Sequence, residues 1–368
     1  MKIKSINLLN YRNYSSFSTD FNPELNIFVG DNAQGKTNLL EAIYFMSTLR
    51  SFRTQNDRDL IKFDEEFFRI QCEIDTDVLT NKAQVVVLKN GKSIKINETM
   101  IRRSSDYIGT LNCVIFSPQD LNFFSDTPRT RRKFLDIEAT KVSNKYLVAL
   151  NHYFDVLKQR NALLKQPQID EDVLSILTHQ LIEDMWIIVD YRLKMVKSLN
   201  KKIKLLFKKL SQEDNSIDLQ YQTEFTTDSE QEFKRLMHDR MKQNKMRDIY
   251  FKITHSGCHR DDLSAYMNTH ELNQIASQGQ KRLVLIALKL ALVEFIYDKE
   301  QRNPILLLDD VFSELDQTHQ QRFLENVPSD SQILLTTTSI DQLKELKRPM
   351  SVFEINKGQL ITRRDLNG

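Results

Sequence analysis

Residues Gly30 to Thr37 match the phosphate-binding pattern G-x-x-x-x-G-K-[ST] in full. They follow the short apolar run 25–29, which predicts a strand, and they open the stretch 37–46, which predicts a helix. Glycines let backbone N–H groups approach a phosphate, and a helix N-terminus attracts anions. The alternative is a glycine-rich turn without chemistry, but the order of strand, loop and helix favours a nucleotide phosphate.

Each part of this loop has an expected role. Lys36 would reach the β- and γ-phosphates, and Thr37 would supply a ligand to Mg²⁺. The other residues expected to contact the nucleotide are Gly30, Asp31, Asn32, Ala33, Gln34 and Gly35.

A second motif lies far along the chain, where the apolar run 305–308 is followed by Asp309 and Asp310. A buried strand that ends in a carboxylate is the usual Mg²⁺-orienting partner of a phosphate-binding loop. We expect Asp309 to belong to the Mg²⁺ shell and Asp310 to position or activate the attacking water. Alone, the motif would be better explained as a strand capped by solvated acids. Together with Lys36, it indicates a nucleoside triphosphatase.

The class of triphosphatase depends on Ser277-Gln278-Gly279-Gln280, which stands just before a predicted helix. A serine at a helix start can simply cap the helix, and that is the alternative interpretation. The pattern Ser-x-Gly-Gln resembles the ABC signature motif, whose helix N-terminus can offer N–H groups to a γ-phosphate held by another subunit. We therefore expect Ser277, Gly279 and Gln280 to contact ATP, and Ser277 to assist catalysis.

Further segments resemble other ABC elements. Gln119 resembles the Q-loop glutamine, which senses Mg²⁺ and the γ-phosphate and takes part in catalysis, and Ser313-Glu314-Leu315-Asp316 resembles the D-loop. Transporters carry a switch histidine after a late apolar strand, whereas here Thr338 falls near that position. A hydroxyl can hydrogen-bond phosphate or water but cannot act as a cation. We expect Thr338 to contact ATP and hydrolysis to be slow, as suits a timing switch.

Beyond these motifs, the chain resembles the RecF family of bacterial recombination mediators, which is related to the heads of SMC and Rad50 proteins. The blocks that carry the resemblance are Asn10-Tyr11-Arg12-Asn13-Tyr14, the phosphate loop, Ser51-Phe52-Arg53-Thr54, Ser117-Pro118-Gln119-Asp120-Leu121, Arg131-Arg132-Lys133-Phe134-Leu135-Asp136, Lys158-Gln159-Arg160-Asn161, His259-Arg260-Asp261-Asp262-Leu263, Ser277-Gln278-Gly279-Gln280 and the run from Leu306 to Asp316. They span the chain nearly end to end. The family usually has proline before the His-Arg-Asp-Asp block, where this chain has Cys258.

The resemblance implies an ATP-dependent homodimer, with two ATP molecules sandwiched between heads. It implies weak, DNA-stimulated ATP hydrolysis and binding to duplex DNA near single-strand gaps. It also implies partnership with RecR and RecO in loading the recombinase RecA, in the setting of DNA damage, the SOS response, repair and replication-fork maintenance.

The pattern of the chain predicts how these motifs are held together. We expect an α/β, ABC-type P-loop head made from residues 1–118 and 252–368, with an α-helical arm inserted at 119–251. The stretch 178–207 has apolar residues close to a 3.5-residue period, and no glycine occurs between 121 and 251. The stretch 214–232 is polar and weakly patterned, which predicts a loop.

Contact with DNA must come from local basic patches, because the net charge is only +2. One candidate patch is Arg129, Arg131, Arg132 and Lys133, and the other is Arg192, Lys194, Lys197, Lys201, Lys202, Lys204, Lys208 and Lys209. Either patch could be a solvated helix face, and the arginine cluster could instead brace the head–arm junction. Neither has the interleaved aromatics of a single-strand binder, which favours contact with a duplex backbone. Arg12 and Arg53 flank the phosphate loop, and for each a phosphate contact and a surface salt bridge are both open.

The composition also limits location and partners. No apolar signal segment begins the chain, and the longest apolar stretch, 283–297, is interrupted by charges. Three widely spaced cysteines without a CxxC pair indicate a reducing cytoplasm and argue against zinc or disulfides. His255 and His259 are four residues apart, but no second pair completes a metal site. A membrane partner is not expected.

Other function classes fit less well. The signature of an ABC transporter's nucleotide-binding subunit follows the phosphate loop much sooner, without so large an insert, and the switch histidine is normally present. A nuclease-fused relative needs a separate metal-carboxylate domain, for which the chain has no room. A simple metabolic kinase would not need the Ser277–Gln280 motif.

Overall fold

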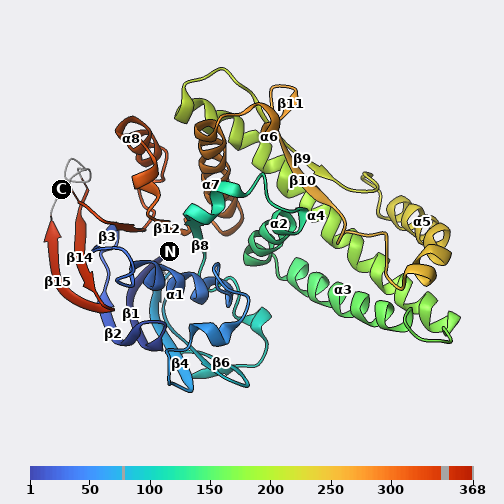
Figure 1. The fold of residues 1–368 in the computed structure, drawn as a ribbon, viewed down its shortest axis with the longest axis horizontal. Helices are drawn as coiled ribbons and strands as arrows, with labels where there is room; N and C mark the ends of the chain where they lie inside the picture. Colours follow the sequence, from blue (N-terminus) through green and yellow to red (C-terminus); the bar gives the residue numbers. More distant parts are fainter. Residues whose placement is uncertain (77–78, 341–347, 367–368) are drawn as a thin grey trace. The chain divides into compact units, whose positions relative to one another are not determined.

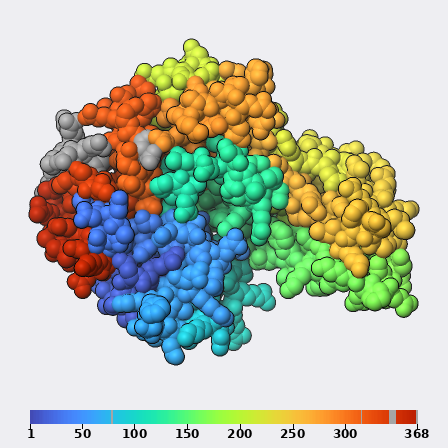
Figure 2. All heavy atoms as spheres, in the orientation of Figure 1, coloured from blue at the N-terminus to red at the C-terminus, as the bar shows by residue number. Residues whose placement is uncertain are grey.

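The computed structural model describes residues 1–76, 79–340 and 348–366 (Figure 1). They form two compact units. The head unit consists of Met1–Leu121, Leu206–Glu213 and Arg282–Gly368, and the arm unit consists of Asn122–Leu205 and Asp214–Lys281. In Figure 2 the N-terminal segment, in blue, and the C-terminal segment, in red, form one continuous surface of the head unit.

The head unit contains a largely parallel six-stranded sheet in the order β15-β14-β3-β13-β12-β8. Only the pairing of β14 with β15 is antiparallel. The strands are β3 (Leu25–Val29), β8 (Cys113–Phe116), β12 (Ile305–Asp309), β13 (Ile333–Thr337), β14 (Met350–Asn356) and β15 (Gln359–Leu366). Every residue of β8 and β12 is buried, as expected for parallel strands that are covered on both faces.

A second six-stranded sheet of the head unit is antiparallel, in the order β2-β1-β4-β5-β6-β7. Its strands are β1 (Lys2–Tyr11), β2 (Tyr14–Asp20), β4 (Phe67–Asp75), β5 (Thr80–Leu88), β6 (Gly91–Ile96) and β7 (Thr99–Ile101). A tight hairpin joins β5 to β6. Its two turn residues are Lys89 and Asn90, because Gly91 already pairs with Leu88, so the turn lies one residue earlier than the Asn90-Gly91 dipeptide predicts.

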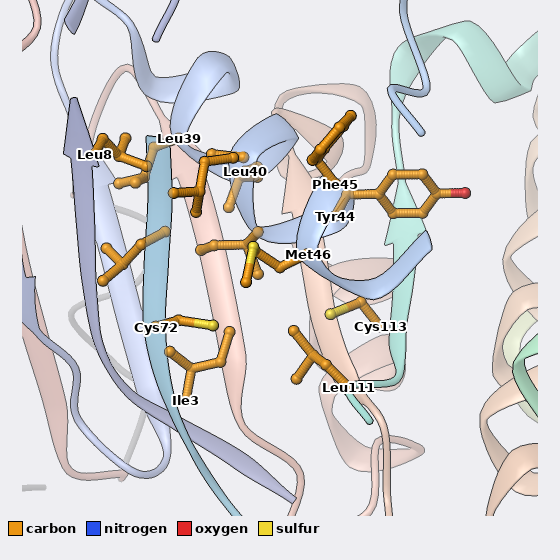
Figure 3. Close-up of a cluster of buried hydrophobic side chains, with 14 of the residues drawn as sticks. Ile3, Leu8, Leu39, Leu40, Tyr44, Phe45, Met46, Cys72, Leu111 and Cys113 are labelled. Atoms are coloured by element: carbon orange, nitrogen blue, oxygen red, sulfur yellow. The ribbon is translucent and has the colours of Figure 1, made fainter. Parts of the chain in front are cut away.

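Helix α1 (Lys36–Thr48) is buried on nearly all sides, and apart from Glu41 its residues from Leu39 to Met46 are apolar. Its side chains belong to one buried cluster with residues of both sheets, among them Leu8 of β1, Cys72 of β4 and Cys113 of β8 (Figure 3). The core therefore fixes the helix that follows the phosphate loop. The remaining elements of the head unit are η1 (Asp57–Leu60), η2 (Ser104–Asp106), η4 (Val311–Glu314) and α8 (Gln317–Glu325), together with parts of η3 (Pro118–Asn122) and α7 (Gln278–Glu300).

The arm unit is built on long helices and a small antiparallel sheet in the order β11-β10-β9. The helices are α2 (Pro128–Val142), α3 (Asn144–Leu163), α4 (Glu171–Ser211), α5 (Glu230–Phe251) and α6 (Leu272–Ile275). The strands are β9 (Ile217–Gln222), β10 (Asp262–Met267) and β11 (His270–Glu271).

The structure corrects three expectations about the arm. Residues 252–281 were expected in the head, but β10 pairs with β9, so they belong to the arm unit. Leu206–Glu213, at the end of α4, were expected in the arm but belong to the head unit. The stretch 214–232 was expected to be a loop, but it contains β9. Residues Ile217–Gln222 alternate apolar and polar side chains over six positions, which is a strand signal that the sequence interpretation missed.

Among the described residues, no helix has the length and apolar character needed to cross a membrane. In the part of the chain that the structure describes, Cys72, Cys113 and Cys258 are buried and form no disulfide.

Candidate nucleotide-binding site

The parallel sheet brings motifs from both ends of the chain to one edge. Strands β3, β13, β12 and β8 are neighbours and run in the same direction, so their carboxyl ends lie side by side. Gly30 follows β3, Thr338 follows β13, Asp310 follows β12 and Gln119 lies just after β8. The carboxyl edge of a parallel sheet is the usual place for a ligand in folds of this kind.

Thr37 and Asp309 meet at this edge. The Thr37 hydroxyl donates to Oδ1 of Asp309 over 2.8 Å. Burial raises the pKa of Asp309, while the hydrogen bonds from Thr37 and Thr336 lower it. A hydroxyl and a carboxylate side by side are the hard oxygen ligands that Mg²⁺ prefers. The residues present therefore fit the metal that the sequence predicts.

Lys36 is buried beside the loop that it was expected to serve. Its ammonium donates to the backbone carbonyls of Gly30 and Asp31. Burial lowers the pKa of Lys36, and the nearby carboxylates of Asp310 and Asp309 act against this shift. The positive charge of Lys36 thus lies close to the two acids at the end of β12.

Both glycines of the loop are required by close packing. A Cβ on Gly30 would lie 2.3 Å from the carbonyl oxygen of Ile355, and Gly35 has a φ of +114° with Asn13 Nδ2 2.7 Å from the same built position. Gly35 therefore adopts a backbone conformation that other residues rarely take. The loop keeps its shape only with these two glycines.

Two neighbouring turns stabilise the phosphate loop through hydrogen bonds to Gln34 and Gly35. The Asn13 side chain donates to the carbonyl of Gln34, and the Tyr14 hydroxyl donates to the carbonyl of Gly35. In the β14–β15 turn, the N–H of Lys357 donates to Oε1 of Gln34, and the N–H of Gly358 donates to the backbone carbonyl of Gln34. Part of the N-terminal block that resembles RecF thus has a structural task, which is to brace the phosphate loop.

Asp310 has a constrained backbone and a carboxylate oxygen without a hydrogen-bond partner in the described residues. It adopts a left-handed backbone conformation with φ of +51°, and its N–H donates to the Thr336 hydroxyl over 3.0 Å. Its Oδ1 is buried and has no hydrogen-bond partner within the described residues. A buried acceptor normally has a donor, so this oxygen keeps unused hydrogen-bonding capacity at the sheet edge.

The sequence interpretation missed Glu41, although an acid inside the apolar stretch of a predicted helix was a visible signal. Glu41 is completely buried on α1. Arg12 binds both of its carboxylate oxygens, at 2.8 and 2.9 Å, and also donates to the carbonyl of Asp59. Arg53 lies 3.6 Å from Glu41 and donates to the Asn38 side chain. Both arginines beside the loop are therefore anchored by one buried carboxylate.

The signature segment is a helix cap with an exposed N-terminus. The N–H of Gln280 donates to the Ser277 hydroxyl, and the N–H of Ser277 donates to the Gln280 side chain, which is the capping box arrangement. The capping interpretation is therefore right for the local structure. Ser277 and Gly279 are exposed, so this end of α7 is accessible to another molecule.

The other predicted residues lie on the surface. Gln119 and Thr338 are exposed. Asp120, next to Gln119, accepts from the N–H of Ser117 and pairs with buried Lys289 of α7 at 3.3 Å. In the segment that resembles the D-loop, the Ser313 hydroxyl donates to the carbonyl of Asp310.

The basic run on α4 contains a buried arginine and several exposed lysines. Arg192 was expected on a DNA-facing surface, but it is 1% exposed and binds Asp136, Tyr221 and the Cys258 carbonyl. Arg192 lies on the buried face of α4, because its position follows the same helical period as the apolar residues of that helix. The neighbouring lysines Lys197, Lys201 and Lys204 instead line an open groove whose floor is formed by Leu193, Val196, Leu219 and Tyr221.

The arginine cluster braces the arm unit internally. Arg131 binds both carboxylate oxygens of Asp262, and Arg132 donates to the carbonyl of Asp261. These bonds join α2 to β10 and the segment before it. His255 and His259 do not form a shared site, since His255 binds Asp248 and His259 contacts the Tyr153 hydroxyl.

The fold and the site define the class of protein, an ATPase head of the ABC type with an inserted arm. A family model described as an AAA ATPase domain matches residues 1–337. The DNA replication and repair protein RecF of Streptococcus equi subsp. zooepidemicus is 42% identical over 98% of both chains, and RecF of Streptococcus pneumoniae is 38% identical over 98% of both. The chain belongs to the RecF family.

Solved structures agree with this assignment. The recombination mediator protein RecF in its ATP form, from the RecFOR pathway, matches with a TM-score of 0.91 and 30% identity, covering 99% of this chain and 97% of the other. An Smc head domain from Pyrococcus furiosus matches with a TM-score of 0.55 at 17% identity over 99% and 96% of the two chains, which shows a shared fold. The protein is thus an ATP-binding ATPase of DNA replication and repair.

Proposed function

We propose that the protein is a switch that dimerises when it binds ATP and that, as a dimer, binds duplex DNA near single-strand gaps and helps to load the recombinase. The observation that carries this proposal is the exposure of the signature residues at the start of α7. The N-terminus of α7 is exposed at Ser277 and Gly279, ready to complete the site of a second copy.

We assign most steps of hydrolysis to the residues at the sheet edge of one copy. Lys36 and the backbone of residues 30–37 would hold the phosphates, with Arg12 and Thr338 as further contacts. Thr37, Asp309 and Gln119 would hold Mg²⁺, which supplies charge neutralisation for the phosphates. Asp310 would orient the attacking water, while Ser277, Gly279 and Gln280 of the other copy would face the γ-phosphate.

For DNA we favour the lysines on the exposed face of α4. Lys197, Lys201 and Lys204 are exposed, and the Lys204 ammonium lies 3.6 Å from a carboxylate oxygen of Asp218. Arg192 of the same run and Arg131 and Arg132 of the other patch bind groups inside the arm unit. The lysines are therefore the better candidates for contact with a phosphate backbone. These lysines would bind the phosphate backbone of the duplex and would not select a gap by themselves.

The partners come from relatives. Related RecF structures belong to the RecFOR pathway, and we extend to this chain a partnership with RecR and RecO and a place in the cytoplasm, where the chromosome lies. No observation favours the alternative role of a transporter's nucleotide-binding subunit.

Sedimentation velocity tests the switch. We expect a monomer without nucleotide, a dimer with ATP and Mg²⁺, and a further shift with gapped duplex DNA. Asp310→Asn should accumulate as the ATP-bound dimer, because the substitution keeps the size of the side chain and removes the carboxylate. A protein that stays monomeric at saturating ATP, for both wild type and Asp310→Asn, would rule out the proposal.

A further inference from the structure

Thr336, at the carboxyl end of β13, lies between the two acids of the site. The strand register places it opposite Asp309. Its hydroxyl donates to Oδ1 of Asp309 over 2.9 Å and accepts from the N–H of Asp310 over 3.0 Å. The side chain is 1% exposed, so solvent does not compete for these bonds.

A hydroxyl has one proton to donate, and the geometry decides where it goes. The other acceptor within reach is the carbonyl of Leu308, at 3.5 Å. A carboxylate at 2.9 Å is a stronger acceptor than a carbonyl at this longer distance. The proton therefore goes to Asp309, and the oxygen lone pairs remain for the N–H of Asp310.

We propose that Thr336 is a positioning residue of the ATPase site, which fixes the carboxylate of Asp309 and the backbone of Asp310 relative to each other through a single hydroxyl. The inference rests on the proposed roles of these two acids. It differs from the sequence expectation, in which Thr338 was the important hydroxyl of the Thr336-Thr337-Thr338 run.

The consequences for the two acids are distinct. Oδ1 of Asp309 accepts one hydrogen bond from the Thr37 hydroxyl of α1 and one from the Thr336 hydroxyl of β13. The carboxylate therefore cannot rotate freely. Asp310 holds a left-handed conformation that is uncommon for a residue with a side chain. The bond from its N–H to Thr336 stabilises this conformation and so aims the Asp310 side chain.

The choice of threonine also has a physical reason. A β-branched side chain in a strand has few accessible rotamers, so the methyl group of Thr336 helps to hold the hydroxyl in place. Valine has the same shape without the hydroxyl, whereas serine keeps the hydroxyl with more freedom. These two substitutions separate hydrogen bonding from packing.

The test compares Thr336→Val and Thr336→Ser with Thr337→Val. Thr337 is a matched control, because its hydroxyl bonds the carbonyl of Ser339 and not an acid. We expect Thr336→Val to lower kcat by about 10- to 100-fold, as for other partners of metal-binding carboxylates, and to change ATP binding by about 3-fold or less. Thr336→Ser should recover most of the rate, and Thr337→Val should behave like wild type.

Two readouts do not depend on hydrolysis. Electron paramagnetic resonance of Mn²⁺ with a non-hydrolysable ATP analogue should show weaker metal binding in Thr336→Val than in Thr336→Ser. The thermal unfolding midpoint of the nucleotide-free protein should fall in Thr336→Val, because the buried N–H of Asp310 loses its acceptor.

Several outcomes would overturn the proposal. These are wild-type hydrolysis by Thr336→Val, equal losses in the valine and serine variants, or a loss that matches only a smaller folded fraction. Asp310→Asn is measured in parallel. If it hydrolyses ATP normally, the role of Asp310 is wrong. If it is inactive while Thr336→Val is fully active, only the role of Thr336 is wrong.

Discussion

The hydroxyl of Thr37 lies 2.8 Å from Oδ1 of Asp309, although 272 positions separate the two residues in the chain. The parallel register of β3, β13 and β12 brings them together, because it aligns the strand ends that precede the phosphate loop and the two acids. A site of this kind exists only when both ends of the chain have folded into one sheet.

Lys36→Ala should weaken ATP binding by about 10- to 100-fold, because charge-assisted hydrogen bonds to phosphate are lost. Titration with a fluorescent ATP analogue measures this directly. Lys62→Ala, an exchange of another lysine in the head unit, serves as the control. Affinity near that of wild type in Lys36→Ala would show that the loop does not hold the nucleotide.

Changing Lys197, Lys201 and Lys204 to Glu should weaken duplex binding and flatten its dependence on salt. Each lost phosphate contact lowers the slope of log K against log salt by about 0.9, so a change of roughly 3 is expected. The matched control changes Lys158, Lys165 and Lys242 to Glu, which are also exposed lysines of the arm unit. An identical slope in the two triple variants would assign the groove lysines to a solvated face.

Arg192→Met should destabilise the protein by about 3–5 kcal/mol, because it leaves the carboxylate of Asp136 without its buried partner. Denaturant unfolding gives this difference. Lys201→Met, an exposed position on the same helix, should change the free energy of unfolding by less than about 0.5 kcal/mol. Similar values for the two variants would contradict the internal role of Arg192.

Acidification should destabilise the protein through His259. Burial lowers its pKa to about 4 from an ordinary value of 6.5. A neutral ring can accept from Tyr153 at Nδ1 and donate from Nε2 to the carbonyl of Thr254. The folded state therefore disfavours the protonated ring, and stability that is present above pH 6.5 is lost as the pH falls toward 4, by about 1–2 kcal/mol at pH 5.

The measurement is the free energy of unfolding from pH 7 to 5 for wild type and His259→Gln. Burial also raises the pKa of Asp261 to about 6, which acts in the opposite direction below that pH. Only the difference between the two proteins isolates the histidine. Parallel pH profiles would mean that His259 keeps an ordinary pKa.

Lys36→Met and Ser277→Ala should each be inactive alone and should partly complement each other when mixed. If Ser277 of one copy completes the site of the other, a mixed dimer has one doubly altered site and one intact site. We expect part of the DNA-stimulated hydrolysis to return, provided that cross-linking shows mixed dimers and that one filled site keeps the dimer closed.

A linked dimer with both changes on one half provides the decisive control. Under the shared-site model it has no intact site and should be inactive. If the serine acts within its own chain, one site remains intact, so robust hydrolysis by the linked dimer would contradict the shared model.

Several features of this protein could be read from the sequence because they depend on neighbouring residues. The phosphate loop needs glycines and a lysine at fixed spacing, the buried strands need continuous apolar runs, and the cap of α7 needs Ser277 three residues before Gln280. Local hydrogen bonding and burial determine each of these patterns, so the fold class and the family could be inferred from the chain alone.

Tertiary structure decided the rest, because contacts between distant segments leave no local pattern. The pairing of β9 with β10 moved residues 252–281 into the arm unit. Arg192 and Lys201 look alike in a basic run, but the helical period turns the first toward Asp136 and the second toward solvent. Among adjacent threonines, only the strand register shows that Thr336 faces the two acids, since one residue along a strand reverses the direction of the side chain.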